Sequence, residues 1–433
     1  MIASSPSENA SRPLPAQNQF DANILIIGAL FFVFGFVTWL GSVLIPYLKI
    51  ACELNTFESY FVAFSFYISY ALMAIPSAWI LKRTGYKKGM AMGLLLMASG
   101  TLLFIPAALT RQYLLFLVGL FVQGGGLTIL QTASNPYVTL LGSRESAAKR
   151  ISVMGICNGV AGVIAPLALG SVILSDADSF NARLVSLSGA QKELLLNDLA
   201  HRVMVPYFMM MTVLLLLSLL IYFSQLPEID ADEEDLATNE ANRGKDSVFQ
   251  FPNLVLGVAT LFLYVGVEVI AVDTIFGFAE SQGIAVRTAK FFTSFTIFNM
   301  LIGYGIGIFC IPRFIQQPQA LKYSAMAGIV FFAVAISTTG VVAVIFIGLL
   351  GLANSLVWPA VWPLALQGLG RFTKAGSSLL IMAIGGGAIL PLLYGRLAQS
   401  FNPHAAYWVV LPTYIFILFY AVRGHKAKGK VPG

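Results

Sequence analysis

The feature that most constrains this chain is a succession of apolar stretches, each about twenty residues long, that follow one another with few interruptions. A helix of about twenty residues, rising about 1.5 Å per residue, crosses a hydrocarbon core of about 30 Å. Only 11% of the residues are charged, against roughly a quarter in a soluble domain. We therefore predict an all-α membrane protein with twelve spans, at residues 22–49, 57–81, 89–109, 113–141, 151–175, 203–226, 252–280, 290–312, 321–339, 341–367, 376–398 and 404–422.

Basic residues predict the orientation of these spans. Most of the 26 Lys and Arg residues fall in alternate loops or in the tails, for example around residues 82–88, 144–150 and 371–374. Because cytoplasmic loops are enriched in Lys and Arg, both termini are expected in the cytoplasm. The net charge of +6 follows from this topology, so no nucleic-acid partner is expected. The three cysteines are scattered, which predicts neither a disulfide framework nor a metal site, and no cofactor is expected.

The chain divides into two similar halves. An acidic segment, residues 227–250, separates a six-helix bundle at 1–226 from a second bundle at 251–433 and is predicted to be a solvated linker. Without gaps, the segment from Asn135 aligns with that from Trp362, and Ser42 aligns with Asp273. Parallel repeats of this kind place a substrate site near the midplane, between halves that rock around it. The loop at 176–202 is predicted to form a short helix on the membrane surface.

Ionisable residues inside a span are candidates for function, because a charge at the centre of a membrane costs about 3 kcal/mol or more. Only Glu268 and Asp273 lie well inside a predicted span, and both are on the seventh. Five residues separate them, or about 140° around a regular helix, so an intact helix would not present both to one point. Either the helix unwinds near Gly266 or Gly277 to form a sodium site at both acids, or only one acid faces the pathway. A structural carboxylate bonded to a neighbouring helix is the alternative.

Amide and aromatic side chains recur within the spans. Gln131 and Asn135 share one face of the fourth span, and the tenth span carries Asn354, Trp358 and Trp362. An amide can match sugar hydroxyls, which both donate and accept hydrogen bonds, and aromatic rings fit the apolar face of a pyranose. These residues, with Asn158, Asn299 and Trp39, are the candidates for sugar binding. Interhelical hydrogen bonding or aromatic packing is the alternative for each of them.

The loop AWILKRTGYKK, residues 78–88, resembles the conserved loop of the major facilitator superfamily, with the pattern Gly-x-x-x-Asp-Arg-x-Gly-x-Arg-Arg. Arg83, Gly85, Lys87 and Lys88 match this pattern and are the candidate gating-loop residues. Ala78 and Lys82 depart from it, so no salt bridge from the missing aspartate is expected. The alternative is that these charges serve only to orient the spans.

More specifically, the chain resembles the fucose, galactose and glucose cation symporters of bacterial inner membranes. The matching motifs are LIPYLK at 44–49, TILQTASNPYVTLLG at 128–142, YVGVEVIA at 264–271 and GGGAILPLLYG at 385–395. The resemblance implies the major facilitator fold and import of a monosaccharide with a coupling ion, and it places Asn158 where the family has a sugar-binding asparagine. It also implies acids in the first and fourth spans of fucose transporters, where this chain has Ser42 and Gln131.

Because those two acids are missing, we expect coupling through the seventh span, with Na+ preferred over H+. The expected substrate is a glucose- or galactose-type hexose, and an N-acetylglucosamine importer or a non-sugar exporter is the alternative. No set of residues suits an enzyme active site. We expect a monomer in the bilayer of a bacterial inner membrane.

Overall fold

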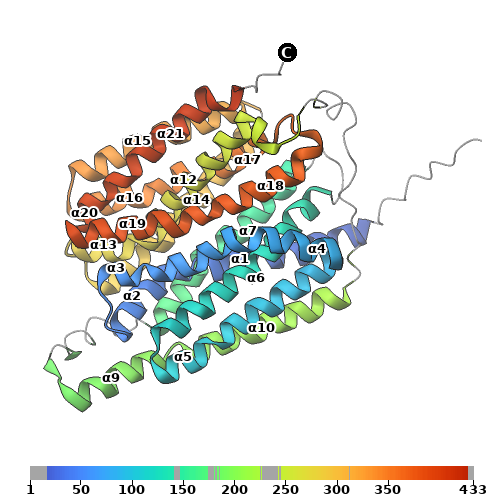
Figure 1. Ribbon diagram of the computed structural model, residues 1–433. Helices are drawn as coiled ribbons and strands as arrows, with labels where there is room; N and C mark the ends of the chain where they lie inside the picture. Colours follow the sequence, from blue (N-terminus) through green and yellow to red (C-terminus); the bar gives the residue numbers. More distant parts are fainter. Residues whose placement is uncertain are drawn as a thin grey trace, which may run out of the picture.

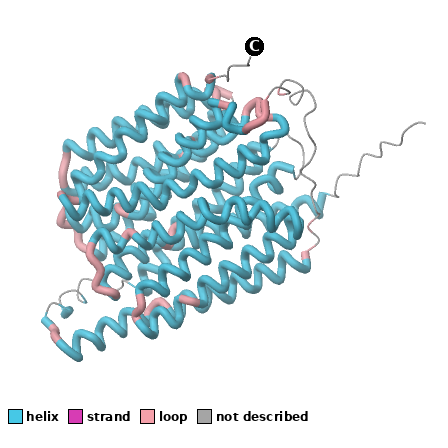
Figure 2. The backbone as a smooth tube through the Cα atoms, in the orientation of Figure 1, coloured by secondary structure: helices cyan, strands magenta, loops and turns pink. Residues whose placement is uncertain are grey.

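The computed structural model describes residues 17–140, 147–173, 180, 183–184, 186–224, 226, 242, 245–311 and 313–427, and within these the regular structure is entirely helical. The helices from α1 to α10 form one half of the bundle and those from α12 to α21 form the other (Figure 1). The first described helix begins and the last described helix ends at the same end of the bundle, called here the terminal end, and the opposite end is called the distal end (Figure 2).

The first half contains six spans. The helices that build it are α1 (Gln17–Thr38), α2 (Gly41–Ala51), α3 (Thr56–Ser59), α4 (Phe61–Leu102), α5 (Phe104–Thr110), α6 (Tyr113–Leu140), α7 (Ala147–Ile173), α9 (Gly189–His201) and α10 (Met204–Phe223).

The second half contains the other six. Its helices are η2 (Val248–Gln250), α12 (Pro252–Asp273), α13 (Ile275–Ser281), α14 (Val286–Cys310), α15 (Gln317–Ser337), α16 (Gly340–Asn354), α17 (Val357–Leu366), η3 (Gly370–Phe372), α18 (Thr373–Met382), η4 (Ala383–Gly385), α19 (Gly386–Ser400), α20 (Pro403–Ala406), η5 (Tyr407–Val409), α21 (Val410–Val422) and η6 (Gly424–Lys426). The acidic residues of the predicted linker, from 227 to 241, lie outside the described residues.

The twelve predicted spans are confirmed. Among the described residues, 11 helical runs are long and apolar enough to cross a membrane, and one of them, Thr56–Thr110, extends over 55 residues. That run is divided at Gly85, whose φ of 78° and ψ of 171° are not helical. Only glycine adopts this conformation readily, so the chain reverses there and the run makes two crossings.

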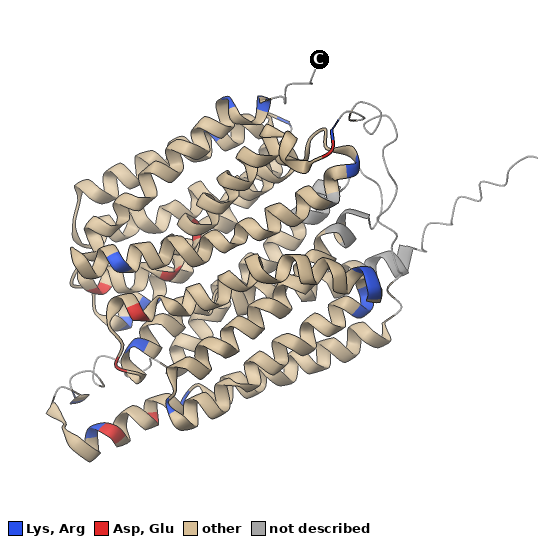
Figure 3. Cartoon of the chain, in the orientation of Figure 1, with Lys and Arg blue, Asp and Glu red and all other residues tan. Residues whose placement is uncertain are grey.

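The surface suits a lipid environment. Large apolar side chains stand exposed along the helices, among them Leu72, Phe309 and Leu216. Charged side chains gather at the two ends of the bundle, and its middle is almost free of them (Figure 3). A soluble protein rarely exposes apolar surface on this scale. The chain is therefore a multi-pass membrane protein.

Spans one and seven, which the sequence pairs as repeats, are both interrupted at similar positions. In span one, α1 ends at Thr38 and α2 begins at Gly41, and Pro46 lacks the N–H that would bond to the carbonyl of Ser42. In span seven, α12 and α13 are separated by Thr274, whose hydroxyl donates to the carbonyl of Ile270 at 2.7 Å. Such a bond back to the preceding turn bends a helix without unwinding it.

The two halves are in contact at the distal end. The backbone N–H of Phe57 donates to Gln399 Oε1 at 3.1 Å, and the ring of Tyr60 lies edge-on to that of Tyr394, with centroids 5.6 Å apart. Gly395 leaves room for Tyr60, since a Cβ atom there would lie 2.3 Å from Tyr60 Cδ2. Nearer the middle, the hydroxyl of Ser294 donates to the carbonyl of Val163 at 3.0 Å. The distal side of the interface between the halves is therefore closed.

The helix predicted on the membrane surface is present as α9, but it continues the line of α10 beyond the distal end (Figure 1). Ion pairs hold it there, because Arg111 contacts Glu193 at 2.6 Å and Lys192 contacts Glu53. The hydroxyl of Tyr47 also donates to the carbonyl of Ala200 at 2.9 Å. Polar contacts thus hold α9 at the distal end of the bundle.

Candidate functional site

Glu268 lies in the middle of α12, within a group of tyrosines. The hydroxyl of Tyr264, one turn earlier on the same helix, donates to Glu268 Oε1 at 2.6 Å. Tyr304 of α14 and Tyr414 of α21 lie near enough to interact electrostatically with its carboxylate. Glu268 is only half-buried, so its carboxylate remains accessible at mid-depth in the bundle. An accessible carboxylate surrounded by hydroxyl groups can accept hydrogen bonds from a polyhydroxylated molecule.

Asn354 extends this group to α16. Its Oδ1 accepts a hydrogen bond from Tyr414 at 2.7 Å, whereas its Nδ2 is buried and has no partner among the described residues. One and two turns further along span ten, Trp358 and Trp362 stack with ring centroids 5.3 Å apart, and both are half-buried. The second half thus supplies a carboxylate, an amide and two partly accessible indole rings, from spans seven and ten.

The first half supplies amides from α6 and α7. Gln131 and Asn135 are half-buried, and their side chains make no hydrogen bond within the described part of the chain. Asn158 is also half-buried and donates to the carbonyl of Phe31 at 3.4 Å, which connects α7 to α1. In the other half, Asn299 bonds to the carbonyl of Phe295 on its own helix at 2.9 Å and is buried. Of these four amides, Gln131 and Asn135 therefore have the most hydrogen-bonding groups without a partner among the described residues.

Trp39 lies between the two halves. It is buried in a small apolar cluster with Val272, Ile297 and Met300, and Tyr304 packs against that cluster. A Cβ atom on Gly162 of α7 would lie 2.4 Å from Trp39 Cδ1, so this glycine is what admits the indole ring. Trp39 thus packs next to the tyrosine group around Glu268 and is held by helices of both halves.

Asp273 lies apart from Glu268. The chain is helical through Gly266, and Gly277 lies inside α13, so of the two alternatives considered for span seven the unwinding near these glycines is not observed. Helical bonds also continue across Thr274, since its N–H donates to the carbonyl of Ile270 at 3.1 Å. Among the described residues no group of three His, Cys, Asp or Glu side chains could hold a metal ion. The helix is therefore regular between the two acids, and its geometry directs their side chains about 140° apart around the axis.

The candidate gating loop lies at the turn between spans two and three. The guanidinium group of Arg83 stacks over the Trp79 ring at 3.8 Å, and the ammonium group of Lys87 donates to the carbonyl of Ser224 at the end of α10. Lys88 is exposed, and Gly85 makes the reversal described above. Gly85 and Lys87 thus fix the turn on the end of span six.

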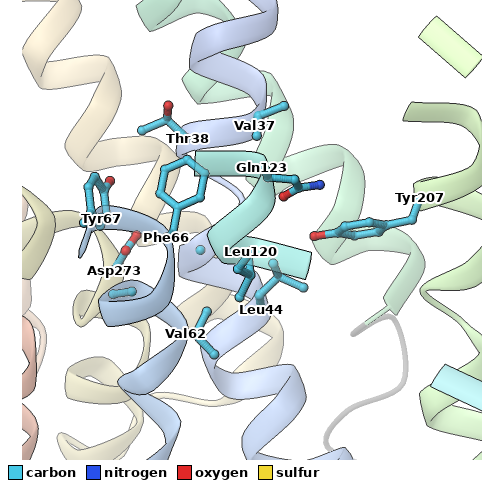
Figure 4. Close-up of a pocket in the computed structure, with 12 residues that line it drawn as sticks. Val37, Thr38, Leu44, Val62, Phe66, Tyr67, Leu120, Gln123, Tyr207 and Asp273 are labelled. Carbon is cyan, nitrogen blue, oxygen red and sulfur yellow. The ribbon is translucent and has the colours of Figure 1, made fainter. Parts of the chain in front are cut away.

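The small cavity of Figure 4 lies between the halves. It has a volume of about 10 Å³ and is lined by α1, α2, α4, α6 and α10 of the first half and by Asp273 of the second. Asp273 is 2% exposed, and neither of its carboxylate oxygens has a hydrogen-bond partner within the described chain.

Comparison with known proteins agrees with this architecture. The sequence profile described as Major Facilitator Superfamily matches residues 27–385. The chain belongs to the Major Facilitator Superfamily. This transporter is 34% identical over 415 residues to a glucose/galactose transporter of Brucella abortus, with 95% of its own chain and 96% of the relative covered.

Two further relatives show the same relationship. A putative glucose/galactose transporter of Helicobacter pylori is 31% identical over 417 residues, covering 94% of this chain and 98% of the relative. The crystal structure of the MFS transporter FucP in the outward conformation superposes with a TM-score of 0.72 at 27% identity, covering 93% of this chain and 98% of FucP. The family and these neighbours are transporters, so this protein is not an enzyme.

Several residues around both acids were not candidates from sequence. Tyr264, Tyr304 and Tyr414 surround Glu268, and Thr38 and Tyr67 line the cavity at Asp273. Isolated tyrosines and threonines are common in membrane spans and carry no pattern that marks them. A signal exists only for Tyr264, which lies one helical turn before Glu268 and so shares its face.

Proposed function

We propose that this protein imports a glucose- or galactose-type hexose together with a cation. The observation that carries the proposal is the half-buried Glu268 carboxylate in the middle of the bundle, with three tyrosines around it and Asn354 joined to them through Tyr414. Such a group can accept and donate hydrogen bonds to several hydroxyl groups at once. The relatives named as glucose/galactose transporters support the same class of substrate.

In this proposal the sugar lies between the halves. Glu268, Asn354 and the stacked Trp358 and Trp362 contact it from the second half. Gln131, Asn135 and Asn158 contact it from the first half, with Trp39 and Asn299 beside them. Indole rings bind the apolar face of a pyranose, and amides match its hydroxyl groups. An N-acetylated sugar is the second candidate, because a pocket lined by asparagine and tryptophan also accepts an acetamido group.

Coupling runs through span seven. Glu268 and Asp273 are the acids that the described part of the chain places in the middle of a span, while Ser42 and Gln131 stand where the fucose type of transporter has acids. We propose Na+ as the preferred ion, with H+ as the alternative. An intramembrane acid is the usual place where the free energy of an ion gradient enters a transporter.

The orientation follows from charge. With both termini in the cytoplasm of a bacterial cell and the protein in its inner membrane, the basic turn at Arg83, Lys87 and Lys88 faces the negatively charged leaflet. The distal end then faces outward. With this orientation, the closed distal interface is the outer side of the transporter.

The experiment is uptake of radiolabelled glucose, galactose and N-acetylglucosamine into proteoliposomes, with a sodium gradient or a proton gradient imposed separately. We expect glucose or galactose to accumulate with the sodium gradient, and Glu268→Gln to abolish accumulation. Glu280→Gln, which removes an exposed carboxylate from the same span, is the matched control and should transport normally. Accumulation of none of the three sugars under either gradient would refute the proposal, and accumulation driven by protons alone would refute its sodium part.

A further inference from the structure

The cavity between Asp273 and the first half contains an unusual set of buried oxygen atoms. Both carboxylate oxygens of Asp273, the hydroxyl of Thr38 and the hydroxyl of Tyr67 are fully buried, and none has a hydrogen-bond partner within the described chain. All three residues line the same cavity (Figure 4). Buried polar atoms in proteins are nearly always paired, so four unpaired oxygens at one place require an explanation.

These oxygens surround the cavity without bonding to one another. In Figure 4, Thr38, Tyr67 and Asp273 lie toward one side of the view, and Gln123 and Tyr207 lie toward the other. Gln123 is already bonded to Thr101 at 2.6 Å, whereas the buried hydroxyl of Tyr207 is a further oxygen without a partner. No basic side chain lines the cavity. For an ionised Asp273, the compensating positive charge therefore comes from something that binds in the cavity.

We infer that this cavity is the binding site for the coupling ion, and that the ion is Na+ held by Asp273, Thr38 and Tyr67. The inference deepens the proposed function and rests on it. Carboxylate and hydroxyl oxygens are the ligands that hard cations take. The volume of about 10 Å³ admits one particle of about the size of a water molecule. A proton alone would neutralise Asp273 but would leave the separated hydroxyls of Thr38 and Tyr67 without partners.

The site is shared between the halves, and this links ion binding to conformation. Asp273 belongs to α12, whereas Thr38 and Tyr67 belong to α1 and α4. A Cβ atom on Gly41 would lie 3.0 Å from Asp273 Oδ2, which is tighter than most contacts of a Cβ atom, so the glycine favours this close approach of the carboxylate to span one. The ligands converge only while the distal side is closed. An ion that binds them therefore stabilises the closed state, because a ligand favours the conformation that it binds more tightly.

Glu268 is not part of this site. Its carboxylate accepts a hydrogen bond from Tyr264 and does not line the cavity, although it lies near enough to Tyr67 to interact with it electrostatically. The inference therefore separates two roles that the sequence could not distinguish. Asp273 holds the ion, and Glu268 belongs to the group proposed to bind the sugar.

The test measures binding of ²²Na⁺ to the purified protein without sugar, with choline chloride keeping the ionic strength constant. We expect saturable binding that Asp273→Asn abolishes and that Thr38→Val and Tyr67→Phe weaken by about tenfold each, the size typical of losing one supporting group at a metal site. Glu280→Gln, which removes an exposed carboxylate of α13, is the matched control and should bind Na+ normally. Glu268→Gln should also retain Na+ binding. Binding that survives Asp273→Asn, or that Glu268→Gln abolishes, would overturn the assignment.

Sugar counterflow separates this inference from the proposed function, because exchange of labelled for unlabelled sugar needs no ion gradient. We expect Asp273→Asn to retain counterflow and to lose sodium-driven accumulation. Counterflow without any Na+ binding by the wild type would overturn the sodium site and leave hexose transport standing. Absence of counterflow in the wild type would refute the proposed function itself. A second measurement uses spin labels at Thr110 and Ser400, which lie at the distal end of each half. Na+ should shorten the distance between the labels. An unchanged distance would contradict the inference that Na+ stabilises the closed state.

Discussion

Gly395 of α19 packs against the ring of Tyr60 across the closed distal interface, and its replacement by alanine gives a direct test of that closure. The added Cβ atom would lie 2.3 Å from Tyr60 Cδ2, whereas carbon atoms in ordinary contact are about 3.5–4.0 Å apart. Tyr60 has little freedom to move away, because it is buried and packs edge-on against Tyr394. The overlap is therefore relieved most easily by separating the two halves.

The magnitude follows from the cost of overpacking. An extra carbon in a well-packed interior costs typically about 1–3 kcal/mol. Because this contact exists only in the closed state, the whole cost falls on the equilibrium between distal-closed and distal-open forms, and it shifts that equilibrium roughly 5- to 150-fold toward the open form. Uptake should fall in proportion, since every cycle passes through the closed form.

The assay is the distance distribution between spin labels at Thr110 and Ser400, together with sugar uptake. Gly395→Ala should lengthen the distances, and Tyr60→Ala in the same chain should restore them by removing the obstructing ring. Gly277→Ala is the matched control, because a Cβ atom there would meet nothing within 4 Å. An unchanged distribution with normal uptake in Gly395→Ala would refute the argument that this contact defines the closed state.

Two other predictions concern the turn and the amides. Gly85→Ala should destabilise the protein by about 1–3 kcal/mol and lower its unfolding temperature in detergent, because the φ of 78° and ψ of 171° at this position are essentially a glycine conformation. Gly155→Ala on α7 is the control, since a Cβ atom there meets nothing within 4 Å. Equal unfolding temperatures for the two variants would contradict this reading of the turn. Gln131→Ala should raise the KM for hexose uptake about tenfold without changing the unfolding temperature, since its side chain supports no hydrogen bond of the described fold; an unchanged KM would remove Gln131 from the sugar site.

Hydropathy was sufficient to predict the twelve spans, because each must satisfy its backbone within the membrane and therefore forms a helix of predictable length. The loop motif that contains Gly85 was likewise sufficient to locate the turn between spans two and three. The sequence could not predict that span seven is interrupted at Thr274. The Thr274 hydroxyl bonds to the carbonyl of Ile270 and also contacts the hydroxyl of Tyr407, which is distant in sequence and is brought there only by the fold.

The candidate site was predicted in part. Glu268 and Asp273 stood out because charge is rare in a span, and the structure places both in the interior. Their surroundings were not predictable, because Tyr304, Tyr414 and Tyr67 come from helices distant in sequence, and only the packing of the helices brings them to the acids. The separation of the two acids was already implied by their spacing on a regular helix.

The close approach of Gly41 to Asp273 brings together nearly equivalent positions of spans one and seven, which are repeats of each other. Ser42, the residue next to Gly41, is the sequence counterpart of Asp273. Where an internal symmetry axis runs through a protein, a position near the axis faces its own counterpart. During evolution, a carboxylate can then be lost from one repeat and gained at the counterpart position of the other, while the negative charge stays in almost the same place. The resemblance implies that fucose-type transporters carry an acid at the place of Ser42, and a comparison made one aligned position at a time would record a loss there and overlook Asp273 across the axis.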